Sequence, residues 1–166
     1  MTAFAEWLAS VLAPWSDLYS SSTALETVVV FLHLGGMLAA GGIAFTLDRA
    51  VLRSARHGWP TRTDLATELH QSHRAVLSGL AVVLLSGLAL TAADPSVFLV
   101  SPIYWVKMAI VVFLLGNGWF LQRAGERLLA APEDADAFRG LKSSALRSAG
   151  LWAASLLGGV ALTLYA

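Results

Sequence analysis

Between Leu25 and Leu47 the sequence is LETVVVFLHLGGMLAAGGIAFTL. Its only ionisable side chains are Glu26, near the start, and His33. A bilayer core of roughly 30 Å requires about 20 mostly apolar residues in a helix. The run is continuously apolar and lacks the alternation of a barrel strand. It therefore predicts a helix that crosses a membrane, since such a helix satisfies its own backbone in lipid.

Three further apolar runs follow, at about 75–93, 103–122 and 145–166. Together they predict an all-α integral membrane four-helix bundle in a single domain, residues 1–166. The composition agrees, since 57% of the chain is apolar, 13% is charged and cysteine is absent. These figures exclude a disordered chain, a disulfide scaffold and a cysteine-ligated metal site. A net charge of zero excludes the basic excess typical of nucleic-acid binding, so the expected partner is a lipid bilayer.

The positive charges are divided unevenly among the connections between the predicted spans. By the positive-inside rule, the connections that carry them face the cytoplasm, so both termini lie outside. This pattern predicts a multi-pass protein of a bacterial-type inner membrane. Ten of the 11 cations lie in or beside the first and third connections: Arg49, Arg53, Arg56, Arg62, Arg74, Arg123, Arg127, Arg139, Lys142 and Arg147.

Residues 3–18 form a separate unit before the first span. Their apolar side chains recur on one face of a helix, interrupted late by Pro14. We expect an amphipathic helix on the outer membrane surface; the alternative is a helix that binds a partner in a larger complex. The face consists of Phe4, Trp7, Leu8, Val11, Leu12 and Trp15.

Two ionisable residues lie within the predicted spans, where such groups are costly and indicate function. His33 lies about 8 residues into the first span, on the order of 12 Å below the outer boundary. Lys107 lies about 4 residues into the third span, on the order of 6 Å below it. Both could therefore face one site in the outer leaflet. Alternatively, His33 bonds a carbonyl across helices and Lys107 extends to the headgroups.

Small residues are expected at the same level on the other helices. Gly36, Met37 and Ala40 share the face of His33, and the matching levels carry Ser86 with Gly87 and Gly158 with Gly159. Small residues leave room for a flat ligand such as haem, which needs an axial imidazole. The sequence thus predicts haem b on His33, with Gly36, Met37, Gly87, Lys107 and Gly158 around it. Plain helix packing is the alternative for the glycines.

The remaining polar candidates lie toward the cytoplasmic side. His70 and His73 are three residues apart on one helix face, which suits a second metal or haem site, or else a partly solvated pair. Asn117 is the other polar group predicted to be buried, bonded to His73 or to a helix carbonyl. Motifs for a nucleophile, a P-loop or a HExxH zinc site do not occur.

Two short stretches resemble a known group of small membrane proteins. The opening Ile103-Tyr104-Trp105-Val106-Lys107, with the apolar run Met108–Leu115, and the stretch Leu32-His33-Leu34-Gly35-Gly36 resemble the HemJ-type protoporphyrinogen oxidase and CopD-like group. That resemblance implies that His33 ligates haem and that Lys107 is needed for activity, with Arg49 matching a basic residue of the group. The small residues Gly35–Gly42 depart from its aromatic-rich run.

We therefore expect a membrane b-type haem protein with a redox role, in porphyrinogen oxidation or electron transfer, with Lys107 as the candidate catalytic residue. Two alternatives stay open. One is a non-catalytic subunit of a homo-oligomer or of a larger membrane complex. The other is a copper-handling protein, because Met37 and Met108 with His33 could form one soft site.

Overall fold

The computed structural model describes residues 2–165 of the chain, and all of its regular elements there are helices. Four of the helices are long and two are short. In chain order they are α1 (Thr2–Ser21), α2 (Thr23–His57), α3 (Arg62–Ala93), α4 (Pro95–Phe98), α5 (Pro102–Ala130) and α6 (Ala135–Tyr165).

Local signals in the sequence set the helix boundaries. The Ser22 hydroxyl accepts a hydrogen bond from the amide of Leu25 and caps α2, which turns the chain out of α1. Gly58 ends α2 at a φ of 72°, and its N–H donates to Ser54 O at 2.8 Å. That left-handed conformation favours glycine. Thr61 and Asp64 then form a capping box that starts α3.

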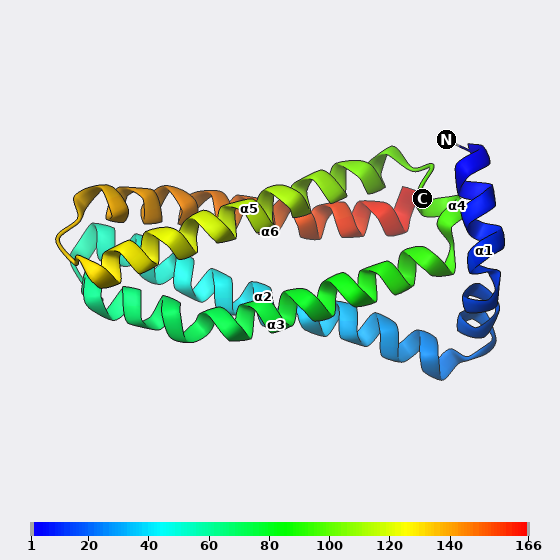
Figure 1. Cartoon of the computed structure of the whole chain (residues 1–166), viewed down its shortest axis with the longest axis horizontal. Helices are drawn as coiled ribbons and strands as arrows, with labels where there is room; N and C mark the ends of the chain where they lie inside the picture. Colours follow the sequence, from blue (N-terminus) through cyan, green and yellow to red (C-terminus); the bar gives the residue numbers. More distant parts are fainter. Residues whose placement is uncertain (1, 166) are drawn as a thin grey trace.

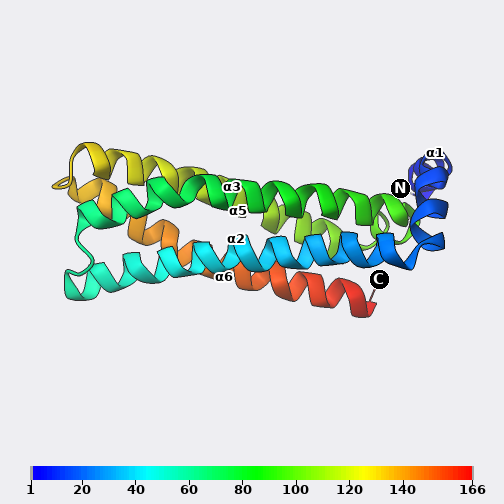
Figure 2. The same cartoon turned by 90° about the horizontal axis from the view of Figure 1, so that it is seen from below.

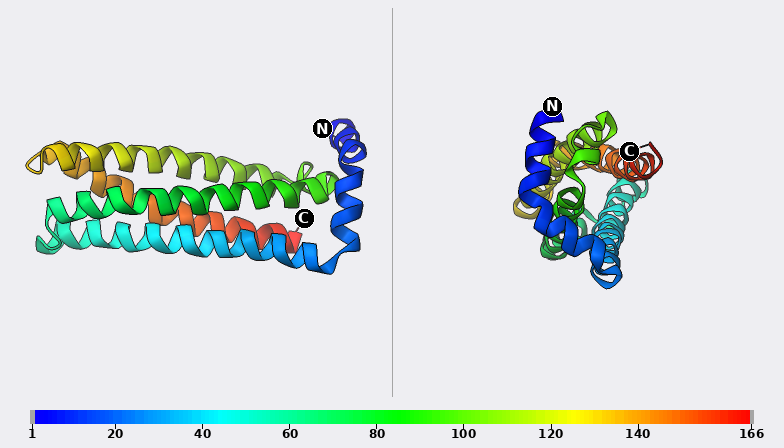
Figure 3. Two further views of the ribbon diagram at one scale, coloured as in Figure 1. Left: turned by 60° about the horizontal axis from the view of Figure 1, so that its bottom comes forward. Right: turned by 90° about the vertical axis from the view of Figure 1, so that its right-hand side faces the viewer.

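The four long helices run alternately up and down as two hairpins, α2 with α3 and α5 with α6 (Figure 1). The hairpins pack through α2 against α6 and α3 against α5, so that each long helix has two neighbours (Figure 2). The two connections 58–61 and 131–134 lie together at one end of the bundle, which we call the loop end. Helix α1 crosses the opposite end, the α1 end (Figure 3).

All four long helices are long and apolar enough to cross a membrane. Each of them extends beyond its predicted span. The added residues lie mostly next to the connections 58–61 and 131–134 and are also helical. Helix α2 has 35 residues and is about 50 Å long, against roughly 30 Å of hydrocarbon. Large apolar side chains are exposed on every long helix, including Phe31, Leu85, Phe113 and Leu157. Such a surface indicates a lipid environment.

The closely packed core lies at the loop end, outside most of the apolar runs. Here the four helices bury a continuous apolar cluster, and three of its leucines are fully buried. Toward the α1 end, buried apolar side chains are fewer and scattered. The core cluster consists of Leu47, Ala50, Val51, Leu65, Ala66, Leu69, Leu128, Ala137, Leu141 and Ala145.

Helix α1 is fixed to the bundle by two hydrogen bonds to the last turns of α3. The indole N–H of Trp15 donates to Ala89 O at 2.9 Å, and the Ser16 hydroxyl donates to Ala93 O at 2.7 Å. Ala93 O is a carbonyl that the end of a helix leaves without an intrahelical partner. The helix also continues through Pro14, which lies within the predicted range 3–18, and ends at Ser21.

Leu141 tests whether the core at the loop end stabilises the fold. Leu141→Ala should lower the free energy of unfolding by about 2–5 kcal/mol, because it opens a cavity around a fully buried side chain. Leu157→Ala, on the same helix but 70% exposed, should change it by less than about 1 kcal/mol. Thermal unfolding in detergent measures both. Equal destabilisation by the two variants would contradict this placement of the core.

Candidate functional site

His33 extends from α2 to α3 in the half of the bundle nearer the α1 end. Its Nδ1 lies 3.1 Å from Val83 O and 3.1 Å from the Ser86 hydroxyl oxygen. The prediction that His33 contacts a carbonyl across helices is therefore confirmed. Ser86 is itself buried, and its hydroxyl donates to Val82 O at 2.6 Å.

This hydrogen bonding favours one tautomer of His33. Because the Ser86 proton is directed to the carbonyl of Val82, Nδ1 carries its own proton and donates it to Val83 O. Nε2 then holds the free lone pair, and it has no hydrogen-bond partner within the described part of the chain. A histidine that ligates a metal usually donates its other ring N–H to such an acceptor. The imidazole is thus oriented as a ligand would be.

Lys107 enters the same region from α5, and glycines of α6 make room for it. A Cβ at Gly158 would lie 3.5 Å from Cβ of Lys107, and one at Gly159 would lie 3.5 Å from its Nζ. The half-buried side chain therefore passes along α6. His33 and Lys107 both lie in the half of the bundle nearer the α1 end, on α2 and α5. The structure thus places in one half of the bundle a histidine and a lysine that are far apart in the sequence.

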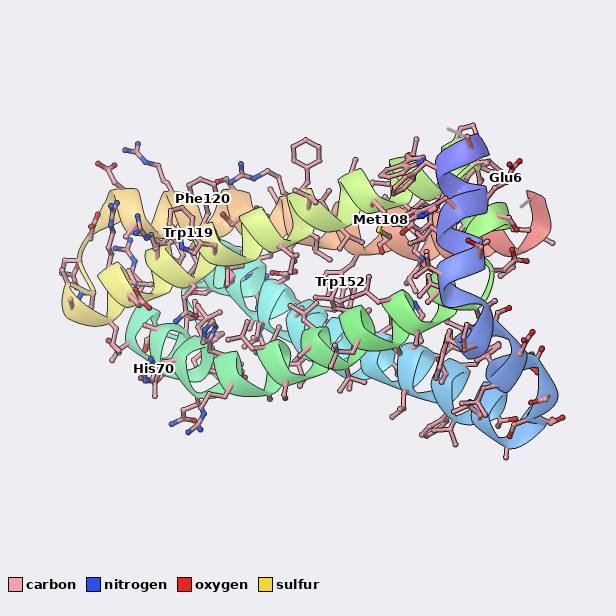
Figure 4. All side chains as sticks on the ribbon, turned by 45° about the vertical axis from the view of Figure 1, so that its right-hand side comes forward. Glu6, His70, Met108, Trp119, Phe120 and Trp152 are labelled. Atoms are coloured by element: carbon pink, nitrogen blue, oxygen red, sulfur yellow. The ribbon has the colours of Figure 1, made fainter. Side chains whose placement is uncertain are left out.

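The glycines at this level make room for the protein's own side chains. Gly87 lies against the His33 ring, with 3.1 Å between a Cβ built there and Cε1. Gly36 lies in the contact between α2 and α3, where a Cβ would lie 2.9 Å from Val83 Cγ2. The helix-packing alternative therefore describes Gly36 well. Met37 and Met108 are both half-buried, and Figure 4 labels Met108 near the α1 end.

Trp152 bounds this region on the side of the loop end. Its ring lies against Gly41 of α2, where a Cβ would come within 3.2 Å, and Figure 4 shows it midway along the bundle. Gly41 follows His33 by about two turns of helix. The indole thus separates the His33 level from the core. The sequence marks Gly41 only as one of several small residues, so this pairing was not predicted.

A second polar group of residues lies beyond Trp152, toward the loop end. Asp48 is 2% exposed, although the sequence placed it in a charged connection, because α2 continues past it. Asn117 is buried as predicted, and its Nδ2 donates to Ser144 O at 2.9 Å, a helix carbonyl. Asp48 Oδ2 and Asn117 Oδ1 have no hydrogen-bond partner within the described residues. Only the three-residue spacing between Asp48 and Val51, which places them on one helix face, could have indicated its burial.

His70 and His73 lie well away from His33. His70 is exposed and His73 is half-buried, and both are on the part of α3 near the loop end, where Figure 4 labels His70. Over residues 2–165, three or more His, Cys, Asp or Glu side chains nowhere gather in a group that could hold a metal ion. A second site at His70 and His73 stays a prediction.

Comparisons with protein-family models, with curated proteins and with solved structures find no match for this chain. Its function is therefore inferred from the residues around His33 and Lys107.

Two adjacent glycines on α2 test the packing beneath His33. Gly36→Ala should lower the free energy of unfolding by about 1–3 kcal/mol, because its methyl group would meet Val83 and the backbone oxygen of Gly79. Gly35→Ala has nothing within 4 Å and should be neutral or stabilising by up to about 1 kcal/mol. Thermal unfolding in detergent distinguishes them. If the two variants are equally stable, the close contact of α2 with α3 is wrong.

Proposed function

We propose that the protein is a membrane b-type haem protein with a redox role, with His33 as the axial ligand. The observation that carries the proposal is the orientation of His33. Its Nδ1 is held by Val83 O and Ser86, which leaves Nε2 for a metal. An imidazole so placed among apolar helices is costly without a function.

The side chains around His33 suit haem as a ligand. His33 is the only histidine in the α1-end half of the bundle, so it would be the one histidine of this half that holds the iron. The Lys107 ammonium would bond a haem propionate, since charge-assisted hydrogen bonds are strong in such surroundings. Trp152 would bound the site toward the loop end. When bound, haem supplies one-electron chemistry. The residues of this chain would bind it and shield it from water.

The resemblance of the His33 and Lys107 stretches to the HemJ-type group supports porphyrinogen oxidation as the enzymatic form of this role. In that form Lys107 is the candidate catalytic residue, because it is, with His33, one of the two ionisable residues identified within the predicted spans. Electron transfer without a bound organic substrate is the other form.

The membrane arrangement is part of the proposal. We place the loop end in the cytoplasm, because 10 of the 11 cations lie toward it, and the α1 end on the outer side of a bacterial-type inner membrane. Helix α1 exposes a stripe of apolar side chains, Phe4, Trp7, Val11 and Leu18. Such a stripe would lie in the outer interface of the bilayer, with α1 as an amphipathic surface helix.

Absorption spectra of the purified protein test the proposal. The wild type should show a Soret band that shifts on reduction, and His33→Ala should lose it. His57→Ala, exposed at the loop-end terminus of α2, is the matched control and should keep it. A colourless wild type obtained in normal yield would contradict haem binding and favour an accessory subunit. Copper bound in stoichiometric amount without haem would favour the copper-handling alternative.

Lys107 provides a second prediction. Lys107→Met should weaken haem binding about tenfold or more, because it removes a charge-assisted hydrogen bond to a propionate. Lys142→Met changes the only other lysine, which lies near the loop end, and should leave the affinity unchanged. Haem titration of the apoprotein measures both affinities. Unaltered binding by Lys107→Met would show that Lys107 does not hold a propionate.

A further inference from the structure

A groove lies between α5 and α6 near the loop end, away from His33 and Lys107. Its volume is about 260 Å³. It combines three arginines with two large aromatic side chains, which is an unusual pairing of charge with apolar surface. The groove is lined mainly by Trp119, Phe120, Arg123, Arg127, Asp136 and Arg147.

The three arginines of the groove lack carboxylate partners. Across the described part of the chain, the only ion pair joins Asp136 to Arg139, so the one acid of the groove is already engaged. Arg123 stacks over the Trp119 ring, with 4.0 Å from Cζ to the ring centroid. Arg147 donates to Ser143 O and to the Ser144 hydroxyl at 3.2 Å. Two of the guanidinium groups are thus held in place, and the groove keeps a positive charge.

The aromatic side of the groove continues toward the α1 end. Trp119 and Phe120 are 50% and 57% exposed, and Figure 4 shows both on α5 beside α6. One to two turns earlier, the exposed side chains of α5 are Val112, Phe113 and Leu115. The arginines therefore lie where the apolar surface of the bundle meets its charged end. Phospholipid phosphates lie at the same level of a bilayer.

We propose that Arg123, Arg127 and Arg147 bind the phosphate headgroup of an anionic phospholipid, with its acyl chains along Trp119 and Phe120. Guanidinium groups bind phosphate through paired hydrogen bonds. Basic pockets between membrane helices suit anionic headgroups, whereas the zwitterionic phosphatidylcholine carries no net charge to attract. This site does not depend on whether His33 binds haem.

Lipid titrations of the full chain in non-ionic detergent test the proposal. Phosphatidylglycerol should raise the midpoint of thermal unfolding saturably, and phosphatidylcholine with the same acyl chains should not. Inorganic phosphate and glycerol phosphate at the same concentrations distinguish a lipid from a small anion. A shift with these soluble phosphates as large as that with phosphatidylglycerol would overturn the lipid assignment, and so would equal shifts with both lipids.

Arginine variants locate the site. The combined variant R123Q/R127Q/R147Q should weaken phosphatidylglycerol binding about tenfold or more. The matched control R49Q/R56Q/R74Q removes the same charge from exposed positions on the other hairpin and should retain the affinity. Equal losses in the two variants would show nonspecific attraction and overturn the proposal. If the first variant does not fold, the single variants R123Q and R147Q against R49Q give the same comparison.

Discussion

The thickness of the bilayer is the constraint on which the rest of this structure depends. Helices of 29 to 35 residues are about 44–52 Å long, whereas the hydrocarbon is roughly 30 Å thick. The excess lies largely at the loop end, where all four helices continue past their apolar runs. The bundle therefore has two parts in two solvents, and different forces hold each part together.

At the loop end, exclusion of apolar surface from water drives packing, and the buried leucines lie there. Lipid supplies no such driving force between helices, which must then associate through small residues and polar contacts. The α1-end half follows that rule. Gly36 and Gly79 let α2 approach α3, and His33 bonds across the same contact. A histidine that joins two helices through one ring nitrogen can also present its other ring nitrogen to a ligand.

The sequence predicted those features that can be recognised from the residues of a single helix, such as its apolar length and the polar side chains within it. The four apolar runs identified the long helices, and the isolated charges within them identified His33 and Lys107. Asn117 was recognised as buried for the same reason. Helix α1 continues through Pro14, as its predicted range 3–18 requires, and ends three residues later than predicted, at Ser21.

The remaining features arise from contacts between helices, which no single run of residues contains. Asp48 directly follows the predicted span 25–47, and it is buried because α2 continues past it. Trp152 faces Gly41 only because α2 and α6 are neighbours. The groove with Arg123 and Arg147 likewise needs α5 beside α6. In sequence these arginines were part of the general excess of positive charge that indicated orientation.

The division of the bundle between lipid and water is the central claim, and cysteine labelling tests it most directly. The chain has no cysteine, so single cysteines can be placed along the exposed face of α6 in lipid nanodiscs and treated with a charged maleimide. We expect Lys142→Cys and Leu146→Cys to react, while Leu157→Cys and Val160→Cys, at the level of Lys107, are protected. Equal reaction at all four positions would contradict it.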